Sequence, residues 1–260
     1  MYRFLLTPRW IGGAALAATA AVIMVMLGNW QLHRYDERTD VNARVDAGAA
    51  AAPAPLASVL TPPSATGTPG PRPADDAAWS KVTAAGRYDT ANEILVRGRT
   101  VGGQVGYEVV TPLLLDDGTA VLVDRGWIPP APGGATAEPA VPPAPGGRVT
   151  VEGRVHASES RPGPIERRDG RIQVRRVALD QLAGELPYPV YGGYVLLTAQ
   201  TPPADPAFVA IPVEHESALQ NGGYAIQWWM FAAMALAAYG WLVWREAHPR
   251  STPDRAPGAR

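Results

Sequence analysis

The sequence predicts two transmembrane helices flanking a mostly antiparallel external β domain, an α+β fold built as a small barrel or sandwich with one short helix. Two stretches without charged residues, 10–31 and 224–244, are each long enough to span a bilayer, which takes about 20 residues in a helix. Between them, short β-patterned runs alternate with turn residues, which is typical of small β domains.

The first apolar segment, residues 10–31, follows the short N-terminal stretch 1–9 and carries Trp10 and Trp30 near its ends. Tryptophan is enriched where helices leave the bilayer, so this pattern indicates a transmembrane helix. A cleaved signal peptide is the alternative, because the Ala-rich sequence resembles a cleavage site. The apolar part of a signal peptide is usually about 7–15 residues long, which favours the helix.

One face of this segment consists of small residues. Gly13, Ala17 and Ala21 are spaced by four residues and share a helix face. Small residues let two helices approach closely in lipid. The abundance of alanine in the whole chain explains the same spacing equally well, so both interpretations stand.

The region between the apolar segments is predicted to lie outside the membrane. Residues 32–78 are rich in Ala and Pro and are predicted to be a linker, with a single docked turn at 58–60. The β domain is predicted over 79–223. Its Pro/Gly insert at 129–147 cannot form a regular strand, because proline lacks the donor that a strand ladder needs.

Alternating residue patterns and turn residues define the elements of the β domain. A short helix is predicted at 178–186, with Asp180 near its start and Gly184 near its end. Asp117-Gly118 is a hairpin-turn signal. The predicted strands are 79–89, 93–99, 106–115, 119–128, 148–158, 171–177 and 188–199.

Charge predicts the orientation in the membrane. The flanks 1–9 and 245–260 carry six basic and two acidic residues, whereas residues 32–223 carry 17 basic and 22 acidic residues. Because basic flanks stay in the cytoplasm, both termini are predicted to be cytoplasmic and the central domain extracytoplasmic. No Arg-rich presequence precedes Trp10, so we expect a multi-pass protein of a bacterial plasma membrane. The net charge of −1 suggests no nucleic-acid partner.

The composition excludes several kinds of active site. The chain has no cysteine, which excludes disulfides, Fe–S clusters and thiolate metal sites. Its five methionines are Met1 and four residues of the apolar segments, which excludes a Met-rich copper site in the external part. The usual hydrolase motifs are missing, so the chain is predicted not to be an enzyme.

Histidines are the remaining candidates for a cofactor ligand. His33 follows the first apolar segment and His215 precedes the second, so both can lie at the outer membrane surface. A neutral imidazole is the natural axial ligand of haem iron where cysteine and methionine are absent. An ordinary surface position is the alternative for each. His156 lies in a strand pattern and is predicted to be structural, and His248 lies in the C-terminal tail.

The start of the second apolar segment is crowded with aromatic and polar residues, in the sequence NGGYAIQWWMF at 221–231. On a helix, Tyr224 and Gln227 share one face. A polar side chain inside a membrane segment usually faces protein or a ligand. Gln227 is therefore a candidate site residue, and the alternative is a hydrogen bond to Asn29 or Gln31 of the first helix.

Several stretches resemble, in order, the SURF1 family of cytochrome c oxidase assembly factors. LGNWQLHR at 27–34 is similar to the family's Leu-Gly-x-Trp-Gln-x-x-Arg, and DGTAVLVDRGWIP at 117–129 is similar to its Arg-Gly-Trp-Val-Pro block. GRYD at 86–89 and GYEVVTPL at 106–113 precede the second block, and YAIQWWMFA at 224–232 resembles the family's Tyr-Ala-x-x-Trp. Each block alone is weak, but the ordered set with two flanking helices is specific.

The resemblance implies an assembly factor that acts on haem-copper oxidase at the haem a stage. Its implied partner is the large catalytic subunit, with haem a synthase as a further candidate, and its implied transient cofactor is haem a. In several bacterial members, a His in an Asn-Asn-His-x-x-Tyr-Ala context holds this haem near the membrane. Here Asn221 stands three residues before Tyr224, so that His is absent. His33 and His215 are candidates to substitute, and the alternative is action without that ligand.

The resemblance also assigns roles to residues. The Arg125-Gly126-Trp127 block implies a packed tryptophan, a close approach at the glycine, and an arginine that pairs with a haem propionate or with an acid such as Asp124. The candidate cofactor-binding residues are Trp30, Gln31, Arg34, Tyr224, Gln227 and Trp228, together with His33 and His215.

Three functions compete on this basis. The first is a non-catalytic assembly factor that holds haem, or a haem-loaded oxidase subunit, between the helix ends and the β domain. The second is a structural accessory subunit of a respiratory complex that does not bind haem. The third, a cell-envelope hydrolase, lacks the nucleophile and metal motifs that it needs.

Overall fold

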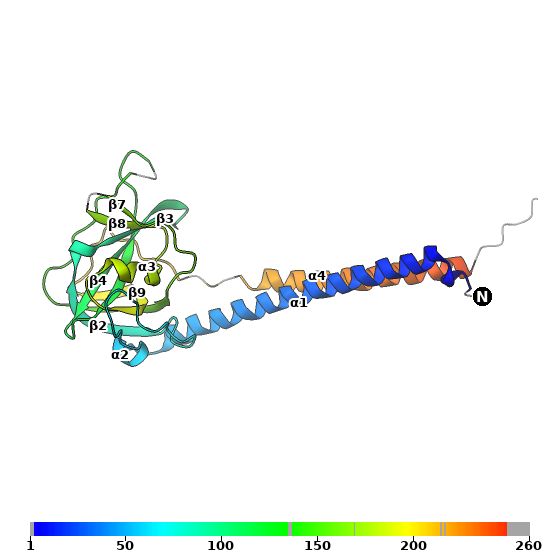
Figure 1. Cartoon of the computed structure of the whole chain (residues 1–260), viewed down its shortest axis with the longest axis horizontal. Helices are drawn as coiled ribbons and strands as arrows, with labels where there is room; N and C mark the ends of the chain where they lie inside the picture. The colour runs from blue at the N-terminus through cyan, green and yellow to red at the C-terminus, as the bar shows by residue number, and fades with distance from the viewer. Residues whose placement is uncertain (1–2, 135–136, 169, 214, 216, 249–260) are drawn as a thin grey trace, which may run out of the picture. The chain divides into compact units, whose positions relative to one another are not determined.

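The chain folds into two compact units (Figure 1). Residues 1–41 and 216–260 form a helical unit, and residues 42–215 form a β unit. Two long apolar helices and a mostly antiparallel sheet domain confirm the predicted fold class. The computed structural model describes residues 3–134, 137–168, 170–213, 215 and 217–248.

Two helices long and apolar enough to cross a membrane, α1 (Pro8–Ala50) and α4 (Leu219–Ala247), contain the predicted spans. A short 3-10 helix, η1 (Arg3–Leu6), precedes them. α1 continues to residue 50, so the region predicted as a linker from residue 32 begins as helix. Alanine has the highest helix propensity, and the first proline after Pro8 is Pro53, so nothing in this stretch ends the helix earlier. The predicted tail beyond residue 248 lies outside the described residues.

Small residues lie between the two helices of the helical unit. Ala21 of α1 and Ala225 and Ala232 of α4 are buried. A Cβ atom added to Gly28 would lie 2.4 Å from Nε1 of Trp229, which no real contact allows. The structure therefore favours helix packing as the reason for the small-residue face, and this packing is the geometry that small residues permit in lipid.

The β unit is built on a closed ring of five strands in the order β2–β6–β9–β5–β4, in which β4 pairs again with β2. β3, β8 and β7 extend the sheet beyond β4, and β1 adds a short edge to β2. The parallel pairs are β1–β2, β3–β8 and β5–β9. The strands are β1 (Ala54–Pro55), β2 (Lys81–Tyr88), β3 (Ile94–Val101), β4 (Gln104–Leu115), β5 (Ala120–Ile128), β6 (Val149–Ala157), β7 (Glu166–Arg168), β8 (Arg171–Val174) and β9 (Val190–Thr201).

All seven predicted strands are present, and the two that the sequence pattern missed, β1 and β7, are only two and three residues long. Gly118 in the predicted hairpin turn has a φ of +81°, the left-handed conformation that glycine adopts without strain. The predicted helix at 178–186 appears as α3 (Leu179–Leu182) followed by η3 (Ala183–Glu185). The remaining turns are α2 (Leu56–Val59) and η2 (Thr90–Asn92).

The core of the β unit also holds part of the Ala/Pro-rich region. Leu56 and Leu60 are buried in a cluster with Val82, Val121 and Val195, which confirms the predicted docked turn. The Pro/Gly insert at 129–147 forms no strand in its described residues. Apolar burial therefore fixes the first insert. The second insert is held by Val141, which packs against the cluster of Leu95 and Ile128, and by hydrogen bonds from Arg125 to the carbonyls of Pro142 and Pro143.

Gly28→Leu is expected to separate α1 from α4, because its side chain would occupy the space of Trp229. The chain has no cysteine, so cysteines introduced at Gln31 and Asn221, whose side chains are hydrogen-bonded at 2.8 Å, report helix pairing by disulfide formation. The control is Gly12→Leu, because a Cβ atom there meets nothing within 4 Å. Equal cross-linking in both variants would contradict this packing.

Candidate functional site

The aromatic and amide residues predicted for the site lie around the start of α4 and on the facing part of α1. Trp30 and Tyr224 are 55% and 44% exposed, and Gln227 is exposed as well. Trp228 is half-buried and packs edge-on against Phe231, with ring centroids 6.0 Å apart. The exposed members are therefore available to a partner or to lipid.

Other polar residues of this region hold the helices together. Asn221 Nδ2 donates a hydrogen bond to Gln31 Oε1 at 2.8 Å, and Trp229 Nε1 donates to Asn29 Oδ1 at 3.3 Å. The sequence alternative was a hydrogen bond from Gln227 to Asn29 or Gln31. Both of these residues do bond to α4, but their partners are Trp229 and Asn221. Gln227 forms no hydrogen bond among the described residues, so the alternative role suggested for it is wrong.

The charged residues that follow the apolar part of α1 form local pairs. His33 Nε2 lies 3.3 Å from Glu37 Oε1, and Arg34 Nη1 lies 2.7 Å from Glu37 Oε2. Arg38 Nη1 donates to the backbone carbonyl of Ser217 at 2.9 Å, two residues before α4 begins. His33 and Arg34 therefore face water or a partner, whereas Arg38 fixes the start of α4.

His215 belongs to the β unit. Its Nε2 lies 2.8 Å from Asp46 Oδ1, close to the C-terminal end of α1. The predicted site residues are therefore divided between the two units of the chain, with His33 in one and His215 in the other.

The Arg125 side chain is buried within the β unit. Its Nη1 lies 3.3 Å from Glu93 Oε2, and its Nη2 donates to the carbonyls of Pro142 and Pro143 at 3.3 and 3.0 Å. Burial lowers the pKa of this guanidinium, although Glu93 opposes the effect. The acid that pairs with Arg125 is therefore Glu93 and not Asp124, and the arginine side chain is only 2% exposed.

The neighbours of Arg125 are structural as predicted. Gly126 has a φ of +130°, and a Cβ atom there would lie 3.0 Å from the carbonyl oxygen of Val209. Trp127 is 4% exposed, and its Nε1 donates to the carbonyl of Arg99 at 3.0 Å. The absence of a side chain at Gly126 thus allows the segment after β9 to pass close to the strand, and Trp127 is packed in the core.

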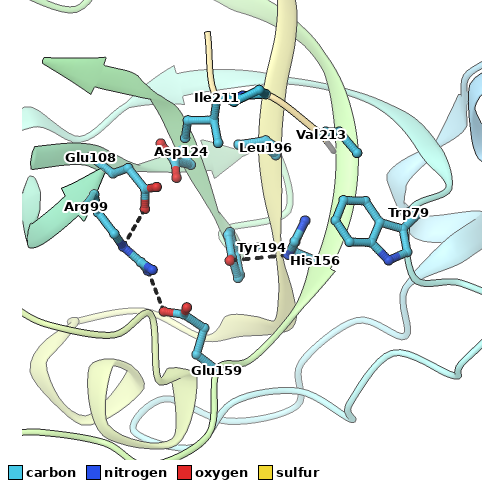
Figure 2. A pocket seen from close by; sticks show the side chains of 11 residues that line it. Trp79, Arg99, Glu108, Asp124, His156, Glu159, Tyr194, Leu196, Ile211 and Val213 are labelled. Carbon is cyan, nitrogen blue, oxygen red and sulfur yellow. Dashed lines mark hydrogen bonds and ion pairs between the residues drawn. The ribbon is translucent and has the colours of Figure 1, made fainter. Parts of the chain in front are cut away.

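A pocket of about 200 Å³ in the wall of the β unit contains a charged network that sequence reasoning missed (Figure 2). Arg99 of β3 lies between two carboxylates, with its Nε 2.8 Å from Glu108 Oε2 and its Nη2 2.6 Å from Glu159 Oε2. Tyr194 and His156 form the opposite wall, and Trp79 packs edge-on against the imidazole at 4.2 Å. The signal in the sequence that could have pointed to this network was that Arg99 and Glu108 are charged residues within two predicted strands.

The carboxyl groups of Asp124 and Glu108 share a hydrogen bond in this pocket. Burial raises the pKa of Asp124 well above its usual range, and the charge of Glu108 adds to the effect. Burial also raises the pKa of Glu108, although Arg99 opposes it. Because two adjacent carboxylates repel each other, the pair is expected to share one proton.

Two further titratable groups of the pocket, His156 and Tyr194, are held neutral. Burial lowers the pKa of His156, and burial raises the pKa of Tyr194 well above its usual value. The hydroxyl of Tyr194 lies 3.4 Å from Nδ1 of His156. In the part of the chain that the structure describes, no three His, Cys, Asp or Glu residues are grouped to hold a metal ion. This arrangement stabilises a fold or a bound polar group, and it offers no activated nucleophile.

The fold and these sites define a class of protein. It is a membrane protein with two paired apolar helices and a β-barrel unit that contains buried ion pairs. A sequence model of the SURF1 family matches residues 18–233, most of the chain. The chain therefore belongs to the SURF1 family.

Individual relatives show the same affiliation. SURF1-like proteins of Mycobacterium bovis and Mycobacterium tuberculosis are each 29% identical over 250 residues, which covers 95% of this chain and 88% of the relative. The cytochrome oxidase assembly protein SHY1 of Saccharomyces cerevisiae is 32% identical over 108 residues, which covers 41% of this chain and 25% of the relative.

Asp124→Asn is expected to change how stability depends on pH. The raised pKa of Asp124 means that folding favours its protonated form, so this contribution is present at low pH and is lost as pH rises through the folded-state pKa. The amide stays neutral, so the variant should lose less stability than the wild type when unfolding is measured between about pH 5 and 8. Asp180→Asn, at an exposed carboxyl of α3, is the control. Parallel pH curves for wild type and Asp124→Asn would contradict the shared proton.

Proposed function

We propose that this protein is a membrane-bound assembly factor for haem-copper cytochrome c oxidase, which acts on the large catalytic subunit at the haem a stage. The observation that carries the proposal is the family match over residues 18–233. The matched region includes the part of α1 around Trp30, the start of α4 and the whole β unit. The name of the yeast relative, a cytochrome oxidase assembly protein, supports the oxidase as the target.

The proposed mode of action is binding without catalysis. The barrel pocket contains Arg99 between two carboxylates and a neutral imidazole, and the described residues place no serine or cysteine nucleophile in it. Its polar atoms are mostly occupied by contacts with one another. A chaperone needs surfaces that hold a partner, and such surfaces do not require an activated group.

The proposed orientation follows from charge. The flanks of the apolar segments carry six basic and two acidic residues, whereas residues 32–223 are acidic overall. We propose a bacterial plasma membrane protein with cytoplasmic termini and an extracytoplasmic β unit. In this orientation, Trp30 and Tyr224 lie near the outer surface of the membrane, where aromatic residues are enriched.

The partner surface that we propose is the exposed part of the helix pair. Among the described residues, Trp30, Tyr224 and Gln227 form no hydrogen bond between α1 and α4, whereas Gln31 and Asn221 do. Exposed aromatic side chains supply large contact areas at little entropic cost, so they suit binding to another membrane protein.

Position 221 does not fit a haem ligand. An amide nitrogen has no lone pair free for iron, and Nδ2 of Asn221 donates to Gln31. The side chain of His33 is 73% exposed, and His215 pairs with Asp46 in the other unit. We therefore propose that the protein assists the catalytic subunit without axial ligation of haem from position 221.

Deleting the gene is expected to lower oxidase activity and the a-type haem absorbance in reduced-minus-oxidised spectra of membranes. Unchanged absorbance and activity would refute the assembly role. In the same strain, Gln227→Leu and Trp228→Ala should restore less oxidase than His156→Ala, because they alter the surface at the start of α4.

The matched control for these variants is Ile226→Ala, since Ile226 is a 57% exposed apolar neighbour on the same helix. Equal losses for all four variants would argue against a site at the helix ends. Stable recovery of the protein with mature oxidase in equal amounts would instead favour the accessory-subunit alternative.

Haem titration of the detergent-purified protein tests the missing ligand directly. We expect no histidine-ligated haem spectrum from the wild type and a new one from Asn221→His, because that change puts an imidazole at the family position. If the wild type gives a histidine-ligated spectrum that His33→Ala or His215→Ala abolishes, a substitute ligand exists and the ligand-free proposal is wrong.

A further inference from the structure

A groove rich in arginine lies on the part of the sheet that extends beyond the closed ring, over β3, β4, β7 and β8. Two adjoining pockets of about 300 and 430 Å³ make up this groove, and they share Arg97, Gly98 and Arg175. The first pocket also has Arg161, Gly163 and Arg176, and the second also has Val105, Tyr107, Arg168 and Gln173.

The strand register explains why these side chains meet. Ile172 and Val174 of β8 belong to the core cluster that contains Leu179 and Leu182 of α3, so Gln173 between them faces the opposite side of the sheet. Gln173 pairs with Leu95 of β3, and the next residue on that face of β3 is Arg97. The groove is therefore a regular face of the sheet, and its floor is set by strand pairing.

A bulge at Gly98 separates two arginines of the same strand. The pairing between β3 and β4 shifts between Arg97 and Arg99, and Gly98 has a φ of +75°. In a regular strand, residues two apart such as Arg97 and Arg99 would share a face, but the bulge makes them oppose the consecutive residues Tyr107 and Gly106 of β4. With it, Arg99 enters the carboxylate pocket, whereas Arg97 enters the groove.

The groove is positively charged within an acidic domain. Residues 32–223 carry 17 basic and 22 acidic residues, yet five arginines border this one surface. Glu166 pairs with Arg97 and with Arg168, the latter at 3.1 Å. Among the described residues, Arg161 and Arg175 form no ion pair, so their charges are left for a ligand.

A buried amide lies at the floor of the same groove. Gln173 is 2% exposed and lines the larger pocket. Its side-chain amide makes no hydrogen bond within the described part of the chain, and it borders the open space of the larger pocket. A ligand oxygen that reaches the floor of the groove would supply the missing partner.

We propose that this groove binds a phosphate-bearing anion. A carboxylate has two acceptor oxygens, whereas a phosphate group offers three and matches several guanidinium groups at once. Four arginines surround the smaller pocket alone, which is more donors than one carboxylate accepts. The phosphate belongs either to a free phosphate compound or to the headgroup of an anionic phospholipid, because both present the same chemistry.

Calorimetric titration of the full-length protein in an uncharged detergent tests this proposal, with inorganic pyrophosphate and short-chain phosphatidylglycerol as probes. At least one probe should bind, and the combined variant Arg161→Gln with Arg175→Gln should weaken binding by about tenfold or more, because charge-assisted hydrogen bonds are lost. Binding of phosphatidylglycerol alone identifies a lipid headgroup, and binding of pyrophosphate identifies a free phosphate compound.

Two controls separate the groove from general charge effects. Arg148→Gln removes an exposed arginine that pairs with Asp116 elsewhere on the unit, and it should leave binding unchanged. Short-chain phosphatidylcholine should not bind. Absence of binding by both anionic probes, or equal weakening by Arg148→Gln and the groove variant, would overturn the proposal. Neither result depends on the oxidase-assembly role, because binding is measured on the isolated protein.

Discussion

The buried ion pair between Arg125 and Glu93 links a strand of the closed ring to the two parts of the chain that pack on it, the sheet extension that begins with β3 and the proline insert. Arg125 lies on β5, and Glu93 immediately precedes β3, the strand that starts the extension of the sheet. The side chain of Arg125 is only 2% exposed, so its guanidinium is shielded from solvent. It donates hydrogen bonds to two carbonyls of the proline insert and lies 4.7 Å from the ring centroid of Phe208. Removing Glu93 would leave the buried charge of Arg125 without its carboxylate, which typically costs about 3–5 kcal/mol. Glu93 itself has a second cationic partner, because Arg171 Nε lies 3.4 Å from its Oε1.

The helical unit divides its polar residues between two tasks. Asn29, Gln31 and Asn221 hold α1 against α4, and the tight contact at Gly28 makes those hydrogen bonds possible. Trp30 remains exposed although its neighbours in sequence face α4. The position at which the family resemblance expects a histidine thus contributes to helix packing in this chain, and the function of the exposed residues need not depend on it.

The sequence was sufficient to predict what depends on local pattern. β2 and β6 alternate clearly between buried and less buried residues, and Gly118 marks a turn that only glycine adopts easily. Contacts between distant residues left no such signal: nothing in the chain shows that Arg125 pairs with Glu93, or that Arg99 lies between Glu108 and Glu159. The length of α1 was underestimated because Ala-rich sequence suits both a helix and, near prolines, a linker. The predicted site residues were placed on the helices, but their separation into structural and exposed members required the structure.

The β unit begins within the last turns of α1, because it starts at Asn42 and the helix ends at Ala50. Lys81 Nζ donates to the carbonyl of Ala49 at 2.6 Å, and Arg154 Nη1 donates to the carbonyl of Val45 at 3.3 Å, so two cations bind the negative end of the helix dipole. Val45 is buried, and Gly48 is so close to the backbone of Trp79 that a Cβ atom would lie 2.4 Å from its oxygen. The last turns of the membrane anchor are therefore also the first structural element of the folded domain. A soluble fragment that starts at the first long strand would lack this element, whereas one that starts at Asn42 would retain it.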